Sequence, residues 1–285
     1  MYAPMWLQNL IDRVRPGETP PTVAVVRLSG TIFDGGMAFR RHGLSLAAYA
    51  GVLERAFKMR HLTAVALAIN SPGGSPVQSS LIAGRIRALA EEKKVPVYAF
   101  AEDVAASGGY WLACAADEVY ADASSIVGSI GVISAGFGLQ EFIGRFGIER
   151  RVHTAGEKKA MLDPFAPEKS ADVERLKALQ QEIHLAFIDM VRARRGDRLK
   201  ADDATLFSGE FWTGARAREL GLVDDLGDLR TVMRRKYGEK VRLRLIGGRR
   251  SFMLRRLGLD GLAGEAAAGA LASVEDRLLW QRYGL

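Results

Sequence analysis

Two continuous apolar runs joined by a helical pattern most constrain the fold of this chain. The first run is Leu62–Ile69, the second is Val95–Ala101, and the helical pattern between them extends from Pro76 to Lys94. Apolar runs without polar alternation are typical of strands that are covered on both faces. Strand, helix and strand at this spacing predict a parallel sheet flanked by helices, which is an α/β fold.

Glycine and serine follow both of these strands. Asn70-Ser-Pro-Gly73-Gly74 comes after the first strand, and Val104-Ala-Ala-Ser107-Gly-Gly109 comes after the second. Because loops after parallel strands gather at one edge of the sheet, we expect Gly73, Gly74 and Ser107 to be neighbours. A serine at a helix N-terminus beside free backbone N–H groups can act as a nucleophile. The same Ser-Gly-Gly pattern is also common in ordinary tight turns.

The remaining elements continue the α/β pattern, and we expect one folded domain at residues 22–246. Residues 1–21 are predicted to be an N-terminal segment and linker, and residues 247–285 a tail that is first basic and then amphipathic. Ser75 and Pro76 are a good N-cap and first residue for the helix between the two apolar strands. The other expected elements are strands at Val23–Leu28, Glu118–Ala121 and Ile148–Thr154, short β segments broken by glycine within Ser125–Ile133, and helices at Leu44–Met59, Leu139–Phe146 and Glu168–Arg194.

Composition excludes several kinds of chemistry. The single cysteine, Cys114, rules out a disulfide within the chain and a cysteine-based metal site. The four histidines show no metal-ligand spacing, so we expect neither a metal nor a cofactor. Aromatic residues make up 8% of the chain, too few for a base-stacking platform, and we expect no nucleic-acid partner.

The charge pattern and the chain ends bear on location. No apolar run reaches the roughly 18 residues that a membrane-spanning helix needs, and polar residues interrupt Met1–Val14 too often for a signal peptide. We therefore expect a cytoplasmic or peripherally membrane-associated protein. Residues 234–256 hold ten Lys or Arg and one acid, Glu239. This basic segment, with amphipathic stretches at Met1–Val14 and Ser273–Leu285, could adsorb to anionic lipid, although a subunit contact explains it equally well.

A nucleophilic serine needs a general base, and no histidine has a local context that nominates it. Lysine is the alternative in Ser-Lys pairs, provided that burial among apolar groups favours its neutral form. Lys159 has apolar neighbours in Met161, Leu162 and Phe165. Lys158 is its rival. Adjacent side chains on an extended segment point to opposite faces, so we expect only one of the two lysines to face the site. A solvated surface charge is the ordinary alternative for either lysine.

Four motifs in a fixed order resemble the signal peptide peptidase A family of serine proteases. They are Asn70–Gly74, Ala106–Trp111, Gly128–Val132 and Thr154–Phe165, and the resemblance continues through Phe207–Trp212 and Gly221–Asp224. The resemblance implies the ClpP/crotonase-like α/β fold. It also implies a Ser-Lys dyad that cleaves peptides, which in many members are the remnants of signal peptides in membranes.

The same motifs imply roles for individual residues. Ser107 matches the nucleophile, Lys159 the general base, and Ser129 the serine that hydrogen-bonds this lysine in the family. The amide of Gly108, with one from Gly73 or Gly74, would form the oxyanion hole. Lys158 stands where the family often has a tyrosine, so both lysines remain candidates. Short members of the family form rings in which the serine and lysine of one site come from adjacent protomers, and we expect a homo-oligomer.

Three hypotheses for function follow. The first is a serine endopeptidase that cleaves hydrophobic, extended peptides such as signal-peptide remnants. The second is a crotonase-type acyl-CoA enzyme, which would share the fold but use carboxylates for acid–base chemistry, whereas the glycine-rich stretches here carry serine. The third is a non-catalytic membrane-associated scaffold, against which the presence of both Ser107 and Lys159 argues.

Overall fold

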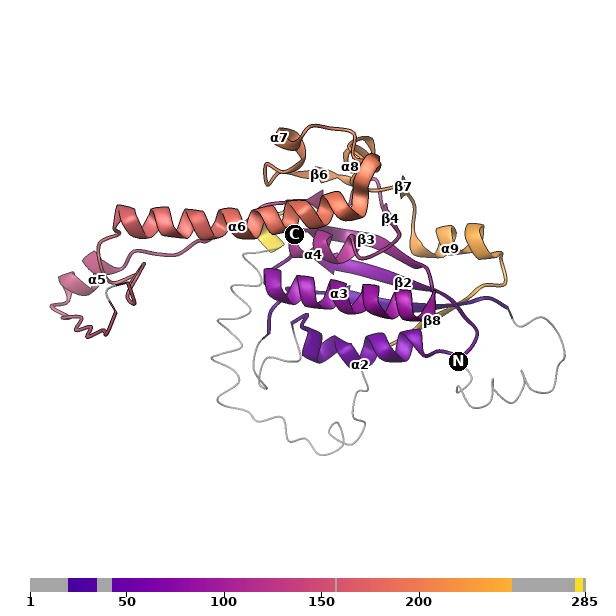
Figure 1. Cartoon of the computed structure of the whole chain (residues 1–285), viewed down its shortest axis with the longest axis horizontal. Helices are drawn as coiled ribbons and strands as arrows, with labels where there is room; N and C mark the ends of the chain where they lie inside the picture. The colour runs from indigo at the N-terminus through magenta and orange to yellow at the C-terminus, as the bar shows by residue number, and fades with distance from the viewer. Residues whose placement is uncertain (1–19, 35–42, 157, 248–279, 284–285) are drawn as a thin grey trace, which may run out of the picture.

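An eight-stranded sheet forms the centre of the computed structural model, which describes residues 20–34, 43–156, 158–247 and 280–283 (Figure 1). The spatial order is β6 (Phe211–Thr213), β5 (Ile126–Gly128), β3 (Val97–Ala106), β2 (Leu62–Ser71), β1 (Thr22–Ser29) and β8 (Arg242–Leu245). β4 (Glu118–Ala121) pairs with β3, and β7 (Asp225–Leu226) pairs with β4. All these pairs are parallel except β5 with β6, which confirms the predicted α/β fold with a parallel sheet.

Eight α-helices and one 3₁₀ turn lie between the strands in the described chain. They are α2 (Leu46–Phe57), α3 (Pro76–Lys93), α4 (Gly108–Ala113), α5 (Gln140–Arg145), α6 (Ser170–Arg195), the 3₁₀ turn η1 (Gly196–Arg198), α7 (Asp203–Leu206), α8 (Gly214–Glu219) and α9 (Leu229–Tyr237). The start of α3 is as predicted, because the Ser75 side chain accepts the N–H of Gln78 at 3.3 Å and Pro76 occupies the first turn.

The two faces of the sheet are covered differently. The helices α2, α3 and α4 contribute to the main core, which includes one set of alternating β3 residues such as Ala99 and Ala105. On the other face, α9 packs Val232 and Met233 against Tyr98 and Phe100 of β3 and their neighbours. Closer to the end of β3, a separate cluster on that second face joins Val104 and Ala106 to Tyr283. The described end of the chain therefore returns to the carboxyl end of β3.

A buried ion pair fixes the C-terminal end of α6. Arg195 is 3% exposed, and its guanidinium donates to Asp224 Oδ2 at 2.7 Å and to the carbonyl of Gly221. Asp224 also accepts the N–H of Val119 at 2.6 Å. Burial alone would raise the pKa of Asp224, but the hydrogen bonds from Arg195 and Val119 hold it below its ordinary value.

The N-terminal half of α6 projects from the body of the molecule. The helix is about 39 Å long at 1.5 Å per residue, and its buried residues, Phe187, Ile188, Val191 and Arg195, all lie in its second half. Figure 1 shows the first half of α6, α5 and the segment that joins them extending away from the sheet. We call residues 131–183 the arm. At its base, His184 Nε2 lies 3.0 Å from the carbonyl oxygen of Ile130.

One predicted strand is wrong. The strand expected at Ile148–Thr154 is absent, because this part of the arm has no regular secondary structure and pairs with no strand among the described residues to satisfy its backbone groups. Of the short β segments expected within Ser125–Ile133, the structure has Ile126–Gly128, which ends where Gly128 and Ser129 adopt positive φ values of 108° and 52°. Met1–Val14 and most of Ser273–Leu285 lie outside the described residues.

Candidate active site

Ser107 lies at the junction of β3 and α4 in an unusual backbone conformation. Its φ of 52° and ψ of −123° are rare for a residue with a side chain. Its N–H donates to the carbonyl of Gly128 at 2.8 Å, and its carbonyl accepts the N–H of Trp111. Ser107 is partly exposed between the buried residues Ala106 and Gly108, and within the described chain its hydroxyl makes no hydrogen bond. The hydroxyl is thus available to a ligand.

The glycine pair after β2 lies against Ser107, as the parallel arrangement predicts. A Cβ on Gly73 would stand 2.8 Å from both Ser107 Cβ and the backbone nitrogen of Gly108. A Cβ on Gly74, whose φ is 140°, would stand 2.1 Å from the carbonyl oxygen of Ile32. Both positions therefore exclude any side chain, and this close approach holds the loop after β2 against the start of α4.

Two backbone N–H groups at this junction have no acceptor among the described residues. They belong to Gly74 and to Gly108, the first residue of α4, where a helix leaves its N–H groups unpaired. A Cβ on Gly108 would stand 3.4 Å from the Gly74 nitrogen, so the two donors are close together. The N–H of Gly73 is in contrast engaged with Ser71 Oγ at 3.2 Å. Of the two glycines predicted from the sequence, Gly74 is the better donor for an oxyanion.

Ser129 is also brought to this junction. β3 and β5 pair in register so that Ala106 lies opposite Gly128, which places Ser129 beside Ser107 in the next position of each chain segment. Ser129 is 3% exposed, and its N–H donates to the carbonyl of Glu210 at 2.7 Å. Its hydroxyl accepts a hydrogen bond from Tyr283 at 3.3 Å. Ser107, Ser129, Gly108 and the glycine pair therefore form one cluster.

Lys159 is not part of this cluster within a single chain. Lys158 and Lys159 lie on the arm, in the segment between α5 and α6, which Figure 1 shows projecting away from α4. Both side chains are exposed, and neither ammonium has a partner among the described residues. The expectation that apolar neighbours bury Lys159 is not met here, because Met161, Leu162 and Phe165 are only half-buried themselves.

Several residues that the sequence analysis left without a role shape the site. Asn70 bridges the ends of β2 and β3, where the register shifts, by donating to Asp103 Oδ2 at 2.6 Å and accepting from the N–H of Val104. Ser79 on α3 is buried, and a Cβ on Gly108 would stand 2.4 Å from its hydroxyl. The signal for Asn70 was its place in the Asn-Ser-Pro-Gly-Gly motif, whereas nothing in the sequence marked Ser79.

The aromatic residues of the Ser-Gly-Gly-Tyr-Trp motif anchor α4. Tyr110 is fully buried, and its hydroxyl donates to the carbonyl of Leu222 at 2.7 Å. Trp111 stacks on Phe187 of α6, with ring centroids 4.7 Å apart. These contacts hold the helix that begins next to Ser107, and they explain why large aromatic side chains follow the two glycines.

Other candidate chemistries find little support in the described part of the chain. Burial raises the pKa of the Cys114 thiol to about 11, which makes this cysteine a poor nucleophile. No group of three or more His, Cys, Asp or Glu side chains in the described ranges could hold a metal ion. Among the same residues, no helix is both long and apolar enough to cross a bilayer.

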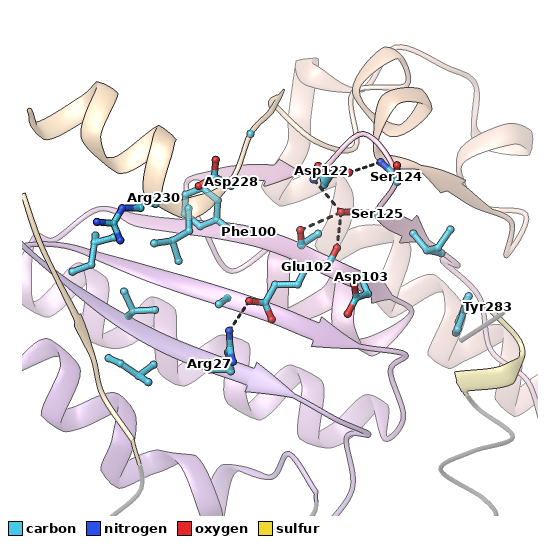
Figure 2. Close-up of a pocket in the computed structure, with 18 residues that line it drawn as sticks. Arg27, Phe100, Glu102, Asp103, Asp122, Ser124, Ser125, Asp228, Arg230 and Tyr283 are labelled. Carbon is cyan, nitrogen blue, oxygen red and sulfur yellow. Dashed lines mark hydrogen bonds and ion pairs between the residues drawn. The ribbon is translucent and has the colours of Figure 1, made fainter. Parts of the chain in front are cut away.

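Figure 2 shows a cavity on the second face of the sheet, next to the candidate site. Its volume is about 1020 Å³, and its lining runs from Arg230 and Phe100 past the Arg27–Glu102 ion pair to Tyr283. Ser107 does not line it. Tyr283 belongs to both places, because it lines one end of the cavity and also hydrogen-bonds Ser129.

Comparisons with known proteins agree on one family. Residues 89–242 match the sequence model of Peptidase family S49. "Protease 4" of Haemophilus influenzae is 31% identical over 78% of this chain, which spans 35% of that protein. A Brucella abortus protein named "Na(+)/H(+) antiporter NhaA" is 53% identical over 99% of this chain, which spans 39% of that protein. Most of the Brucella protein lies outside the match.

A solved structure supports the fold. A mutant of the 1510-N membrane-bound stomatin-specific protease aligns with 81% of this chain and 99% of its own, with a TM-score of 0.51 and 13% sequence identity. At this identity the likeness concerns the fold alone. The chain spans less than two fifths of both curated relatives named above.

Proposed function

Because this chain belongs to peptidase family S49, we propose that it is a serine endopeptidase in which Ser107 is the nucleophile and Lys159 the general base. The observation that carries the proposal is the junction of β3 and α4. There a hydroxyl without a hydrogen-bond partner in the described chain lies beside the unpaired N–H groups of Gly74 and Gly108. A peptide carbonyl bound against these two donors would present its carbon to Ser107 Oγ.

The proposed reaction follows from this geometry. Ser107 Oγ attacks the scissile carbonyl carbon while Lys159 Nζ, in its neutral form, accepts the hydroxyl proton. The negative charge on the carbonyl oxygen is stabilised by the two N–H groups. The C–N bond then breaks, and the lysine returns its proton to the leaving amine. Water hydrolyses the acyl-serine ester in a second step, in which the lysine again accepts a proton.

The lysine in this proposal comes from a neighbouring copy of the chain. The support is that Lys159 is exposed on the arm, which projects away from α4 (Figure 1), and that large apolar side chains of the same arm are also exposed. Phe137 is 83% exposed, Phe142 59% and Phe146 67%. Contiguous exposed apolar groups mark interaction sites. An arm packed on a second copy would cover these side chains and bring its lysine to that copy's serine.

We further propose that the substrates are apolar peptides in an extended conformation. Just before Ser107, on the second face of the sheet, Val104, Ala106 and Ile126 form one apolar cluster with Tyr283, and the Phe211 ring meets the ring of Tyr283. Such a cluster favours apolar side chains over charged ones. Remnants of signal peptides would fit this description.

Single substitutions test the assignment of residues. Ser107→Ala and Lys159→Ala should each abolish cleavage of an apolar peptide, while Lys158→Ala, the matched control one position away, should keep most of it. Circular dichroism and thermal melting establish that each variant is folded. The reverse order for the two lysines would refute the choice of base. Binding of a CoA thioester without any peptide cleavage would instead favour the acyl-CoA hypothesis.

A mixing experiment tests the shared site. Ser107→Ala and Lys159→Ala proteins, each inactive, are dissociated, combined and reassembled. If the serine and lysine of one site come from different protomers, some mixed sites contain both residues and activity returns. If both come from the same chain, the mixture stays as inactive as its components.

A further inference from the structure

The C-terminal residues Trp280–Tyr283 are seated in the candidate site. Tyr283 is 9% exposed, although it follows residues 248–279, which separate it from the end of the sheet domain. Its ring meets Phe211 of β6 edge to face, with centroids 5.1 Å apart. Its hydroxyl donates to Ser129 Oγ at 3.3 Å and lies 3.5 Å from the carbonyl oxygen of Pro72. The tyrosine thus touches the motifs that follow both β2 and β5.

This tyrosine covers apolar residues of β3 that come just before Ser107. Tyr283 packs on Val104 and Ala106, the last outward-facing residues of β3 before the serine, and Ile126 and Trp280 complete the cluster. Figure 2 shows Tyr283 at one end of the cavity, on the short turn at the described end of the chain. A side chain of a bound peptide that lay here would need the same apolar contacts and the same space.

Ser129 adds a second reason why this contact matters. The family resemblance implies that the Ser129 hydroxyl would hydrogen-bond the lysine base. Here that hydroxyl is engaged by Tyr283 instead. A docked Tyr283 therefore fills an apolar subsite and also engages the Ser129 hydroxyl, which the lysine base would otherwise contact.

We propose that Trp280–Tyr283 is a built-in competitor that occupies the peptide-binding subsite next to Ser107 and must leave before a substrate binds. This inference rests on the proposed peptidase function. It assigns the subsite an aromatic side chain as a preferred occupant, because Tyr283 fits between Phe211 and the end of β3 with its hydroxyl on a polar partner.

Kinetics with the full-length chain test the competitor. Tyr283→Ala and Trp280→Ala should each lower the KM for an apolar peptide and leave kcat unchanged, since a competitor raises KM alone. If the segment is docked about nine-tenths of the time, KM falls about tenfold on its removal. Arg282→Ala, an exposed position on the same turn, is the matched control and should behave as the wild type. An unchanged KM in both aromatic variants would overturn the proposal.

Binding measurements separate this proposal from the function on which it rests. A fluorescent peptide with the sequence of residues 278–285 should bind the full-length Tyr283→Ala chain and bind the wild-type chain several-fold more weakly. The same peptide with alanine in place of its tyrosine should not bind. This readout needs no catalysis, so inactivity of every variant would refute the peptidase while peptide binding still supported the docked segment. Equal binding to both chains would refute the docked segment while cleavage still supported the peptidase.

Discussion

At the scale of single residues, the site depends on backbone positions that admit no side chain. Gly73 and Gly74 lie so close to Ser107, Gly108 and Ile32 that a Cβ at either position would overlap backbone atoms. Ser107 itself has a positive φ, which L residues adopt at a cost of about 1–3 kcal/mol. The surrounding contacts hold this conformation, and it turns the serine out of the strand at the start of a helix.

Gly74→Ala should therefore damage both stability and activity. The new methyl group would stand 2.1 Å from the Ile32 carbonyl oxygen, and a φ of 140° adds a conformational cost of about 1–3 kcal/mol. Urea unfolding and peptide cleavage measure the two effects. Gly84→Ala is the control, because it lies within α3 with nothing within 4 Å of the added methyl. It should gain up to about 1 kcal/mol from helix propensity, and a similar loss in both variants would contradict the argument.

The sequence could predict one half of the candidate site and not the other. Ser107 and the glycine pair could be placed together because parallel strands deliver their following loops to one edge of a sheet, and the structure has them in contact. The location of Lys159 could not be predicted. Its apolar neighbours indicated burial, but they lie on the arm, and apolar residues that await a partner look the same in sequence as apolar residues of a core.

At the scale of elements, α4 depends on contacts made by residues outside the reacting groups. It has six residues, so its position is set by what its side chains touch rather than by its own length. Tyr110 ties it to Leu222, and Trp111 ties it to α6. The helix that carries the Gly108 donor is thereby joined to two distant parts of the chain.

Tyr110→Phe should cost about 1–3 kcal/mol in the free energy of unfolding, because it leaves the buried carbonyl of Leu222 without its donor. Chemical denaturation measures this cost. Tyr49→Phe in α2 is the control, since the Tyr49 hydroxyl has no hydrogen bond within the described residues. If the two substitutions cost the same, the Leu222 bond contributes nothing to stability.

The arm offers a prediction about assembly. Replacing Phe142 and Phe146 together by serine should leave the fold of the single chain intact, because both side chains face solvent and mainly contact each other. It should lower the molar mass in solution if the arm packs on a neighbouring copy, and multi-angle light scattering measures that mass. Leu81→Ser, at an exposed apolar position on α3, is the control and should keep the wild-type mass. An unchanged mass in the double variant would refute the proposed role of the arm.

At the scale of the whole molecule, the order and type of the central elements could be predicted because each depends on local pattern. Continuous apolar runs became β1, β2 and β3, and the Ser-Pro pair marked the start of α3. The pattern failed at Ile148–Thr154, where β-branched residues suggested a strand but no strand in the described part of the chain pairs with them. It also could not reveal that α6 is buried along only half of its length, because its apolar stripe continues into the exposed half.

The pair of Arg195 and Asp224 predicts how the stability of the molecule depends on pH. The pKa of Asp224 is lowered in the folded state, so its contribution is complete above the pKa of an unfolded aspartate, about 3.9, and is lost as pH falls through the folded value. Asp224→Asn should cost about 3–5 kcal/mol at neutral pH, because Arg195 is left buried without its charge partner.

The same variant should show a shallower loss of stability than the wild type as the pH falls below about 5, because the lowered pKa of Asp224 no longer contributes to the acid dependence. Thermal melting over this range checks both the cost and the slope. Asp189→Asn, whose side chain is 75% exposed, is the control and should follow the wild-type curve. Parallel acid slopes for Asp224→Asn and wild type would show that another carboxylate governs acid unfolding.

The one-sided attachment of α6 has a consequence for when the chain can act. If the arm supplies its lysine to another copy, then each newly made chain carries an incomplete catalyst, and hydrolysis begins only after encounter with its own kind. Specific activity then rises with protein concentration. Assembly then controls when the enzyme becomes active, and peptides are not hydrolysed until the concentration of the chain is high enough for copies to associate.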